Sequence, residues 1–129
     1  MNRLTSIAWQ ARLGLALVFA YHGMVPKILW LSPQEVAMIQ AHGWGAQAFW
    51  LAPLAGGLEI ALAAALLLFR RRLWPLATAA AVLLVLLVDV ALFSPAFLIQ
   101  AFNPVSSNLA ALCLCWIAWK AESSQVFYG

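Results

Sequence analysis

The chain consists of long apolar runs separated by short polar or basic interruptions. Four continuous runs rich in Leu, Ala and Val stand at about residues 7–29, 46–69, 73–93 and 104–119. The runs lack the alternation expected of strands, and a membrane-spanning helix takes roughly 20 apolar residues. Backbone N–H and C=O groups in lipid must be satisfied within their own segment, which favours helices. We therefore predict an all-α fold, a transmembrane four-helix bundle formed by one domain over residues 1–129.

A short interfacial helix is predicted in the loop after the first run, which reads LSPQEVAMIQAHGWG. Ser32 can cap this helix, and Glu35 stands three residues further on, as in a capping box. Pro33 suits the first turn of a helix, and Gly43 ends the segment. The apolar side chains of the segment and the tryptophans on either side predict that the helix lies along the membrane surface.

Composition narrows the class of protein. Hydrophobic residues make up 66% of the chain and charged residues 9%, and the mean hydropathy is +0.94. Such a chain cannot cover itself with a water-compatible surface, so we expect a multi-pass protein of the cell membrane, in contact with the lipid bilayer. The net charge of +3 comes largely from Arg70, Arg71 and Arg72. Because these arginines stand together in one short loop, they indicate topology, and no nucleic-acid partner is expected.

Basic residues also orient the predicted spans. Arg3 and Arg12 stand at the start of the first run, the three arginines separate the second and third runs, and Lys120 follows the fourth. Short loops rich in Lys and Arg stay in the cytoplasm, so we predict that both termini are cytoplasmic and that residues 31–44 lie outside. The competing interpretation is a cleaved secretory signal over residues 1–20, which end in the small-residue pattern VFA. The apolar pattern continues through YHGMVPKIL without a break, which favours a span.

Ionisable side chains inside the predicted spans point to a site, because a charge in hydrocarbon is costly unless it is paired, neutralised or hydrated. Counted along the helices, His22 and Asp89 lie about 23 to 24 Å from the cytoplasmic edge, and Asn108 lies about 6 Å below the outer edge. We therefore expect these three side chains to share one layer and to line one cavity that opens outward. Glu59 is placed about 15 Å up, nearer the middle of the membrane, at the inner end of this polar file.

Small residues surround Glu59 in the stretch APLAGGLEIALAAA. Ala55 and Gly56 stand one turn before it and Ala63 one turn after it, so this helix face is expected to pack closely against another helix. A carboxyl in such a place fits two interpretations. It is either a protonated group that only hydrogen-bonds a neighbouring helix or a part of a functional site, and the residues alone favour neither.

The end of the first run, FAYHGMVPKILW, carries helix-disturbing residues. Gly23 permits close helix approach, and Pro26 frees the backbone carbonyl one turn earlier, which exposes polar groups near the outer mouth of the cavity. Lys27 can anchor at the interface, meet Glu35 or bind a ligand anion. A lone histidine such as His22 is more often a satisfied interface residue, and its depth match with the aspartate of the third run makes it a candidate.

The two cysteines and the possible metal ligands give little indication of function. Cys113 and Cys115 stand two residues apart on a predicted helix and point about 200° apart, which disfavours a disulfide between them. We interpret them as small apolar side chains in a packed span, with a thiol link to a partner as the alternative. No span carries a histidine and a carboxylate three or four residues apart, so no metal site is predicted.

Four short motifs resemble the DoxX-like family of small four-helix membrane proteins: YHGMVPKIL, GGLEIAL, the aspartate of the third run, and NPVSSNLA. They occur in order over nearly the whole chain. The resemblance implies quinone-coupled oxidation of sulfur compounds, redox homeostasis or help in assembling other membrane proteins, and it does not choose among them. With the physical arguments above, it marks as ligand-binding His22, Lys27, Glu59, Asp89, Asn103 and Asn108, and as structural Gly23, Pro26, Gly56 and Pro104.

Two functional classes stay open. The first is a redox-associated accessory that holds a quinone-like or other small amphipathic molecule in the outward-opening cavity, with the carboxyls and His22 handling protons. The second is a non-catalytic assembly or scaffold protein, in which the same side chains fix helix packing or contact a partner's span. The sequence has no haem, flavin or nucleotide motif, so a quinone or a redox partner subunit would supply any redox group, and whether the chain is an enzyme stays open. A proton-linked transporter would need a homo-oligomer, because alternating access uses paired repeats.

Overall fold

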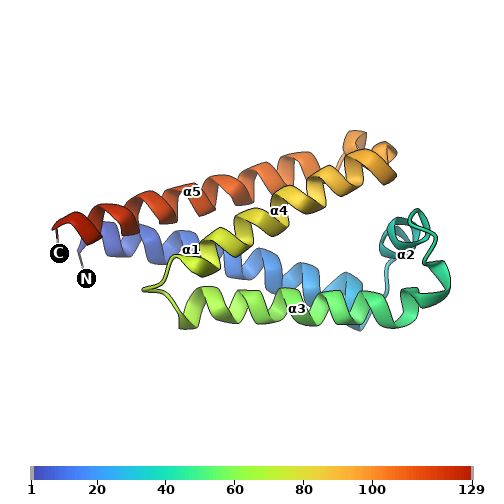
Figure 1. The fold of residues 1–129 in the computed structure, drawn as a ribbon, viewed down its shortest axis with the longest axis horizontal. Coiled ribbons are helices and arrows are strands. Elements are labelled where there is room, and N and C mark those ends of the chain that lie inside the picture. Colours follow the sequence, from blue (N-terminus) through green and yellow to red (C-terminus); the bar gives the residue numbers. More distant parts are fainter. Residues whose placement is uncertain (1, 129) are drawn as a thin grey trace.

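The computed structural model describes the backbone of residues 2–128 and the side chains of residues 2–125, and this part of the chain contains helices and loops but no strand. Four long helices lie side by side, and a short helix covers one end of the bundle (Figure 1). The predicted all-α fold, with a short helix after the first long one, is confirmed. The helices are α1 Arg3–Met24, α2 Pro33–Gln40, α3 Ala48–Leu68, α4 Trp74–Phe93 and α5 Pro104–Tyr128.

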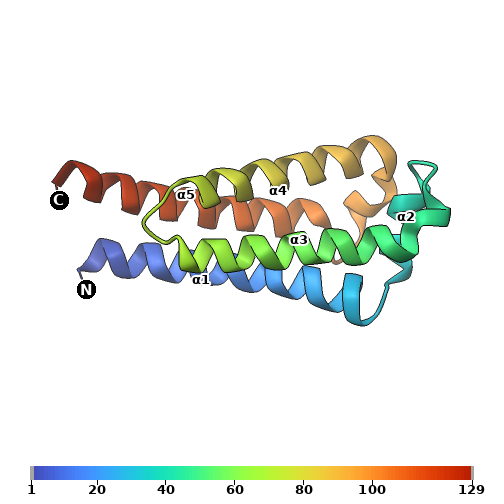
Figure 2. The same cartoon turned by 60° about the horizontal axis from the view of Figure 1, so that its bottom comes forward.

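The two ends of the bundle differ. Both termini lie at one end, with the loop of residues 69–73 on the same side, and we call this the terminal end (Figure 2). The opposite end is the α2 end. It also holds three short helical segments, which are the π-helical turn Val25–Leu29 and the 3₁₀ turns Gly45–Gln47 and Pro95–Ile99.

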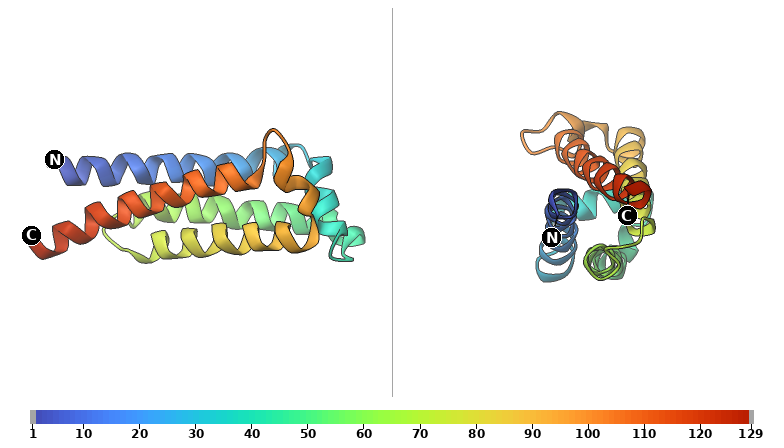
Figure 3. Two further views of the ribbon diagram at one scale, coloured as in Figure 1. Left: turned by 90° about the horizontal axis from the view of Figure 1, so that it is seen from above. Right: turned by 90° about the vertical axis from the view of Figure 1, so that its left-hand side faces the viewer.

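The long helices pack in a fixed lateral order. α1 packs against both α3 and α5, whereas α4 packs mainly against α5 (Figure 3). The core between them is built from leucines and many alanines, among them the fully buried Leu15, Leu66 and Ala79. Small side chains let helices approach closely, which is a main source of helix association in lipid. The bulky apolar side chains on the outer surface, such as Phe49 and Leu92, are exposed and suit contact with acyl chains.

Two glycines fix the crossing of α1 and α3. A Cβ atom added to Gly23 would lie 2.5 Å from the backbone oxygen of Gly56, and a Cβ atom on Gly56 would meet the oxygen of Gly23 equally closely. Any larger residue at either position would force the two backbones apart. The glycine pair therefore sets the register of α1 against α3, and with it the neighbours of Glu59.

Three of the four long helices are long and apolar enough to cross a membrane, over Arg3–Leu29, Gly45–Leu68 and Trp74–Phe93. The chain is therefore a multi-pass membrane protein. The described part of α5 is less apolar, because it opens with serines and an asparagine and carries Lys120 and Glu122 further on. The fourth span and the cytoplasmic placement of the termini stay predictions.

α1 and α5 both extend beyond the predicted spans at the terminal end. α1 begins at Arg3, where the side chain of Asn2 accepts a hydrogen bond from the N–H of Thr5 at 2.8 Å and so caps the helix. α5 continues past residue 119 to Tyr128. These extensions project beyond the end of α3 and create the walls of a cleft that is described below.

Candidate functional site

The site at the α2 end begins with Pro26. Proline has no N–H, so the carbonyl of His22 loses its helical donor and the helix widens into the π-helical turn. In that turn the N–H of Trp30 donates to the carbonyl of Val25 at 2.9 Å. The freed carbonyl of His22 accepts instead from the ammonium of Lys27, at 3.3 Å. Pro26 thereby turns the Lys27 side chain back along its own helix.

Lys27 joins three helices through its ammonium group. Its Nζ lies 3.2 Å from a carboxylate oxygen of Glu35 and 3.3 Å from those of Glu59. We call Lys27, Glu35 and Glu59 the Lys27 cluster. With the carbonyl of His22, the cluster matches all three ammonium donors with acceptors. The three side chains are only 12 to 15% exposed, and one cation faces two carboxyls, so the cluster can keep a proton on one carboxyl or carry one negative charge.

The residue count predicted that Glu59 lies deeper in the membrane than His22. In the structure, Glu59 lies level with Gly23, so this prediction is wrong. A Cβ atom added to Gly23 would lie 3.1 Å from the Cβ atom of Glu59. The difference arises because α1 projects past the end of α3, where Arg12 donates to the carbonyl of Leu66 at 2.8 Å. Counting α1 from residue 7 therefore placed His22 too high by about five residues, or roughly 7 Å.

His22 contacts the Lys27 cluster through its backbone carbonyl, and its imidazole belongs to the surface of the bundle. The residue is exposed, and the ring of Tyr21 meets it edge-on at 6.4 Å between centroids. Within the described part of the chain, the ring of His22 has no hydrogen-bond partner. It therefore keeps one donor and one acceptor for a molecule arriving from the lipid or the interface.

Asp89 pairs with His42, which the sequence did not single out. His42 Nε2 lies 2.6 Å from Asp89 Oδ1, and His42 Nδ1 lies 2.8 Å from the carbonyl oxygen of Met38. The imidazole also stacks on Phe93 at 4.2 Å and on Trp44 at 5.3 Å. Both ring nitrogens face oxygen acceptors, so the doubly protonated imidazolium satisfies both contacts. The hydrogen bond to Asp89, and then the one to Met38, raise the pKa of His42 above its ordinary value of 6.5.

The expected convergence of His22, Asp89 and Asn108 is not found, because each has a different environment. Asn108 donates to the carbonyl of Leu83 at 3.0 Å and so ties α5 to α4. Leu83 stands six residues before Asp89, or about 9 Å along α4, so Asn108 lies deeper than the residue count predicted. α1 packs against α3 and α5 and not appreciably against α4, so His22 and Asp89 stand on helices that are not close neighbours.

Asn103 and Pro104 begin α5. The side-chain oxygen of Asn103 accepts from the N–H of Ser106 at 2.9 Å, which is an N-cap contact. Pro104 occupies the first helical position, where its missing N–H is of no consequence. Asn103 therefore has a capping role, and its predicted ligand contact stays a prediction.

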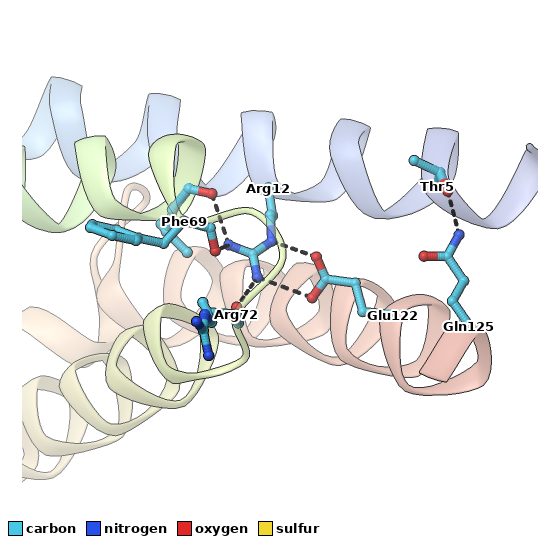
Figure 4. Close-up of polar contacts among 7 residues, drawn as sticks. Thr5, Arg12, Phe69, Arg72, Glu122 and Gln125 are labelled. Carbon is cyan, nitrogen blue, oxygen red and sulfur yellow. Dashed lines mark hydrogen bonds and ion pairs between the residues drawn. The ribbon is translucent and has the colours of Figure 1, made fainter. Parts of the chain in front are cut away.

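A second polar centre lies at the terminal end, around Arg12 (Figure 4). The Arg12 side chain is fully buried, and it forms two parallel contacts with Glu122, from Nε at 2.7 Å and from Nη2 at 3.0 Å. Its guanidinium also donates to the backbone oxygens of Leu66, Phe69 and Arg72, which satisfies carbonyls at the end of α3 and in the following loop. From the sequence, Arg12 is interpreted only as a topology marker. A carboxylate in the last helix was the one signal that could have suggested a partner.

The two cysteines occupy different surroundings. Cys115 is buried in the core, whereas Cys113 is exposed on the outer surface of α5. Both are free thiols. Among the described residues, no group of three or more His, Cys, Asp or Glu side chains is placed to hold a metal ion.

The fold and these ion pairs define the class of the protein as an α-helical, multi-pass membrane protein with a polar centre near each end of its bundle. Residues 16–116 match the DoxX-like family. This match covers most of the chain, so the chain belongs to the DoxX-like family, and the resemblance noted from the four motifs is confirmed. No curated protein and no solved structure matches the chain.

Proposed function

We propose that this DoxX-like membrane protein is a redox-associated accessory that holds a small amphipathic ring compound, of the quinol and quinone type, at its α2 end. The observation that carries the proposal is the Lys27 cluster, which contacts the backbone carbonyl of His22, a residue that is exposed. Together these side chains offer two carboxyls and one imidazole near one ammonium. Such a set binds hydroxyl groups and exchanges protons while most of its charge stays compensated.

The hydrogen-bonding capacity of the site fits a quinol. The ammonium of Lys27 has no donor to spare, whereas the carboxylate oxygens of Glu35 and Glu59 can still accept. A hydroxyl of the guest would donate to one of these carboxylates, and the ring of His22 would donate to or accept from a second oxygen. The exposed ring of Tyr21 meets that of His22 edge-on, and the apolar part of the guest would lie against it.

The chain's own residues would bind the guest and hold protons. A bound quinol supplies two-electron, two-proton redox chemistry. Lys27 positions the two carboxyls, and Glu59 or His22 would take a proton from a hydroxyl group. We place Asp89, Asn103 and Asn108 outside this proposed site, because they are engaged with His42 and with backbone groups.

An assembly or scaffold role is the second candidate. It is favoured by the internal pairing of polar groups, since no buried side-chain nitrogen or oxygen in the described part lacks a partner. In that case the Lys27 cluster would only hold α1, α2 and α3 together. The exposed His22 would then contact a span of another protein.

Co-purification separates the two candidates. The wild-type protein, the His22→Ala variant and the His42→Ala control are purified from membranes in mild detergent, and bound quinones and proteins are identified by mass spectrometry. We expect the wild type and the His42→Ala control to retain quinone, and His22→Ala to retain about tenfold less, which corresponds to the loss of one hydrogen bond in the site. The His42→Ala control tests whether the loss of any histidine at the α2 end lowers the retained quinone.

The opposite outcome supports assembly. If His22→Ala retains the same quinone content as the wild type but loses a protein that the wild type carries, the quinol proposal is wrong. A wild-type protein that carries no quinone even after incubation with added quinone would contradict it as well.

A further inference from the structure

A cleft at the terminal end is separate from the proposed quinol site at the α2 end. The projecting start of α1, the late part of α5 and the loop of residues 69–73 enclose a cavity of about 680 Å³. Arg12 and Glu122, which are paired with each other (Figure 4), are among the residues that line it. The cleft is about the size of a site for a small molecule and is open on one side.

The cleft carries positive charge that the protein itself does not neutralise. Six of the seven Lys and Arg side chains belong to the terminal end, and Glu122 is the single acidic side chain there. Glu122 is already paired with Arg12. Arg70 and Arg71 both line the cleft and are exposed, and neither has an ion-pair partner among the described residues.

The lining of the cleft is amphipathic. The guanidinium of Arg70 lies over the ring of Trp9 at 5.4 Å, which holds this cation at the wall of the cleft. Thr5 and Gln125 hydrogen-bond each other across α1 and α5 and give the cleft a polar side. The apolar side chains that complete it are Leu4, Ala8 and Leu73.

We propose that this cleft binds the phosphate headgroup of an anionic phospholipid. Arg70 and Arg71 would contact the phosphate, because guanidinium groups recognise phosphate oxygens in a bidentate manner. The acyl chains would follow the apolar wall toward the hydrocarbon, since the cleft lies where the apolar helices end. Basic pockets at this level of a membrane protein suit lipid headgroups. The inference does not rest on the quinol proposal, because its residues lie at the other end of the bundle.

Lipid binding to purified protein tests the proposal. Native mass spectrometry measures the affinity of phosphatidylglycerol and of phosphatidylcholine for three proteins: the wild type, the double variant Arg70→Gln/Arg71→Gln, and the double variant Arg3→Gln/Arg72→Gln. The last is a matched control, because it removes two charges from the same end but neither residue lines the cleft. Glycerol 3-phosphate added as a competitor distinguishes a lipid site from a site for a soluble phosphate.

We expect the wild type to prefer phosphatidylglycerol and Arg70→Gln/Arg71→Gln to bind it about tenfold more weakly, with a smaller effect in the control. Equal losses in both double variants would mean that charge alone acts, and the inference would be overturned. Displacement of the lipid by glycerol 3-phosphate at equal concentration would overturn the assignment to a lipid. If the double variant does not fold, Arg71→Gln alone replaces it, with Arg72→Gln as its control and the same two outcomes.

Discussion

Arg12 is the one charged residue that is buried among the described residues. Its side chain is fully buried in a bundle that faces lipid, yet both of its contacts with Glu122 and its contacts with backbone oxygens are made. A buried guanidinium is tolerated only when its donors are matched in this way. Because the partners come from α3, α5 and the loop of residues 69–73, a single side chain ties three elements together at the terminal end.

Replacing Arg12 should therefore be costly. Arg12→Gln leaves the partly buried Glu122 without its cation and leaves carbonyls at the end of α3 without donors, so we expect the free energy of unfolding to fall by about 3 kcal/mol. Unfolding of the purified protein in detergent measures it. Arg3→Gln removes the same charge from an exposed position and should change the free energy by less than about 0.5 kcal/mol. Equal effects of the two variants would show that Arg12 acts only through net charge.

The neighbouring glycines Gly56 and Gly57 allow a matched comparison. A Cβ atom on Gly56 would collide with the backbone of Gly23, whereas one on Gly57 meets nothing within 4 Å. Gly56→Ala should lower the free energy of unfolding by about 1 to 3 kcal/mol, as overpacking does. Gly57→Ala should raise it by up to about 1 kcal/mol, because alanine favours helix. Thermal unfolding of both variants checks this, and destabilisation by Gly57→Ala alone would contradict the helix crossing described here.

Helix ends could be predicted from local sequence signals, whereas contacts between different helices could not. The stretch LSPQEV predicts the N-cap of α2, and this prediction is confirmed, because Ser32 accepts a hydrogen bond from the N–H of Glu35 at 3.2 Å. Gly43 ends the segment with a φ of +83°. The carboxylate of Glu35, however, does not complete a capping box. It binds Lys27, and the N–H of Ser32 donates to Pro26 at 2.9 Å. Long-range partners replaced a local one.

α2 is held over the bundle by contacts that depend on how the loop folds back. Besides Lys27–Glu35 and His42–Asp89, the side chain of Gln34 donates to Gln100 at 3.1 Å. The pairing of His42 with Asp89 could not be predicted from the sequence. His42 lies outside the predicted spans, so counting residues along a span gives no estimate of its depth.

The His42–Asp89 contact predicts a pH dependence for α2. The pKa of His42 is raised in the folded protein, so its contribution to stability is complete below about pH 6.5 and is lost as the pH rises through the folded pKa. Hydrogen exchange of residues 33–44, corrected for intrinsic rates, should therefore show more opening at pH 8.5 than at pH 5.5. In Asp89→Asn this difference should shrink. Equal protection at both pH values in the wild type would contradict the ion pair.

At the scale of the whole molecule, the charge is divided between the two ends. Three of the four acidic side chains lie toward the α2 end with Lys27, and the terminal end holds the remaining basic ones. This division could be predicted from the sequence, because the arginines of the loop after α3 mark one end of the helices. It agrees with the expected placement of the terminal end at the cytoplasmic surface, which stays a prediction.

The lateral order of the helices could not be predicted in the same way. Counting residues estimates depth along each helix, but it does not tell which helices are neighbours. Because α1 packs between α3 and α5, Lys27 meets Glu59 on α3, and Asp89 on α4 finds His42 instead of His22. The candidate residues were thus recognised from their cost in lipid, and their pairing required the structure.

The dissociation constant of a quinol analogue is the most direct test of whether the Lys27 cluster and His22 hold a quinol-type molecule. Isothermal titration of a water-soluble quinol analogue into the purified protein compares the wild type, Glu59→Gln and the matched carboxyl variant Asp89→Asn. We expect Glu59→Gln to weaken binding about tenfold, because the charged carboxylate acceptor of the hydroxyl is replaced by a weaker neutral amide oxygen, while Asp89→Asn stays within about twofold of the wild type. Equal affinities for Glu59→Gln and the wild type, or an equal loss in both variants, would contradict it.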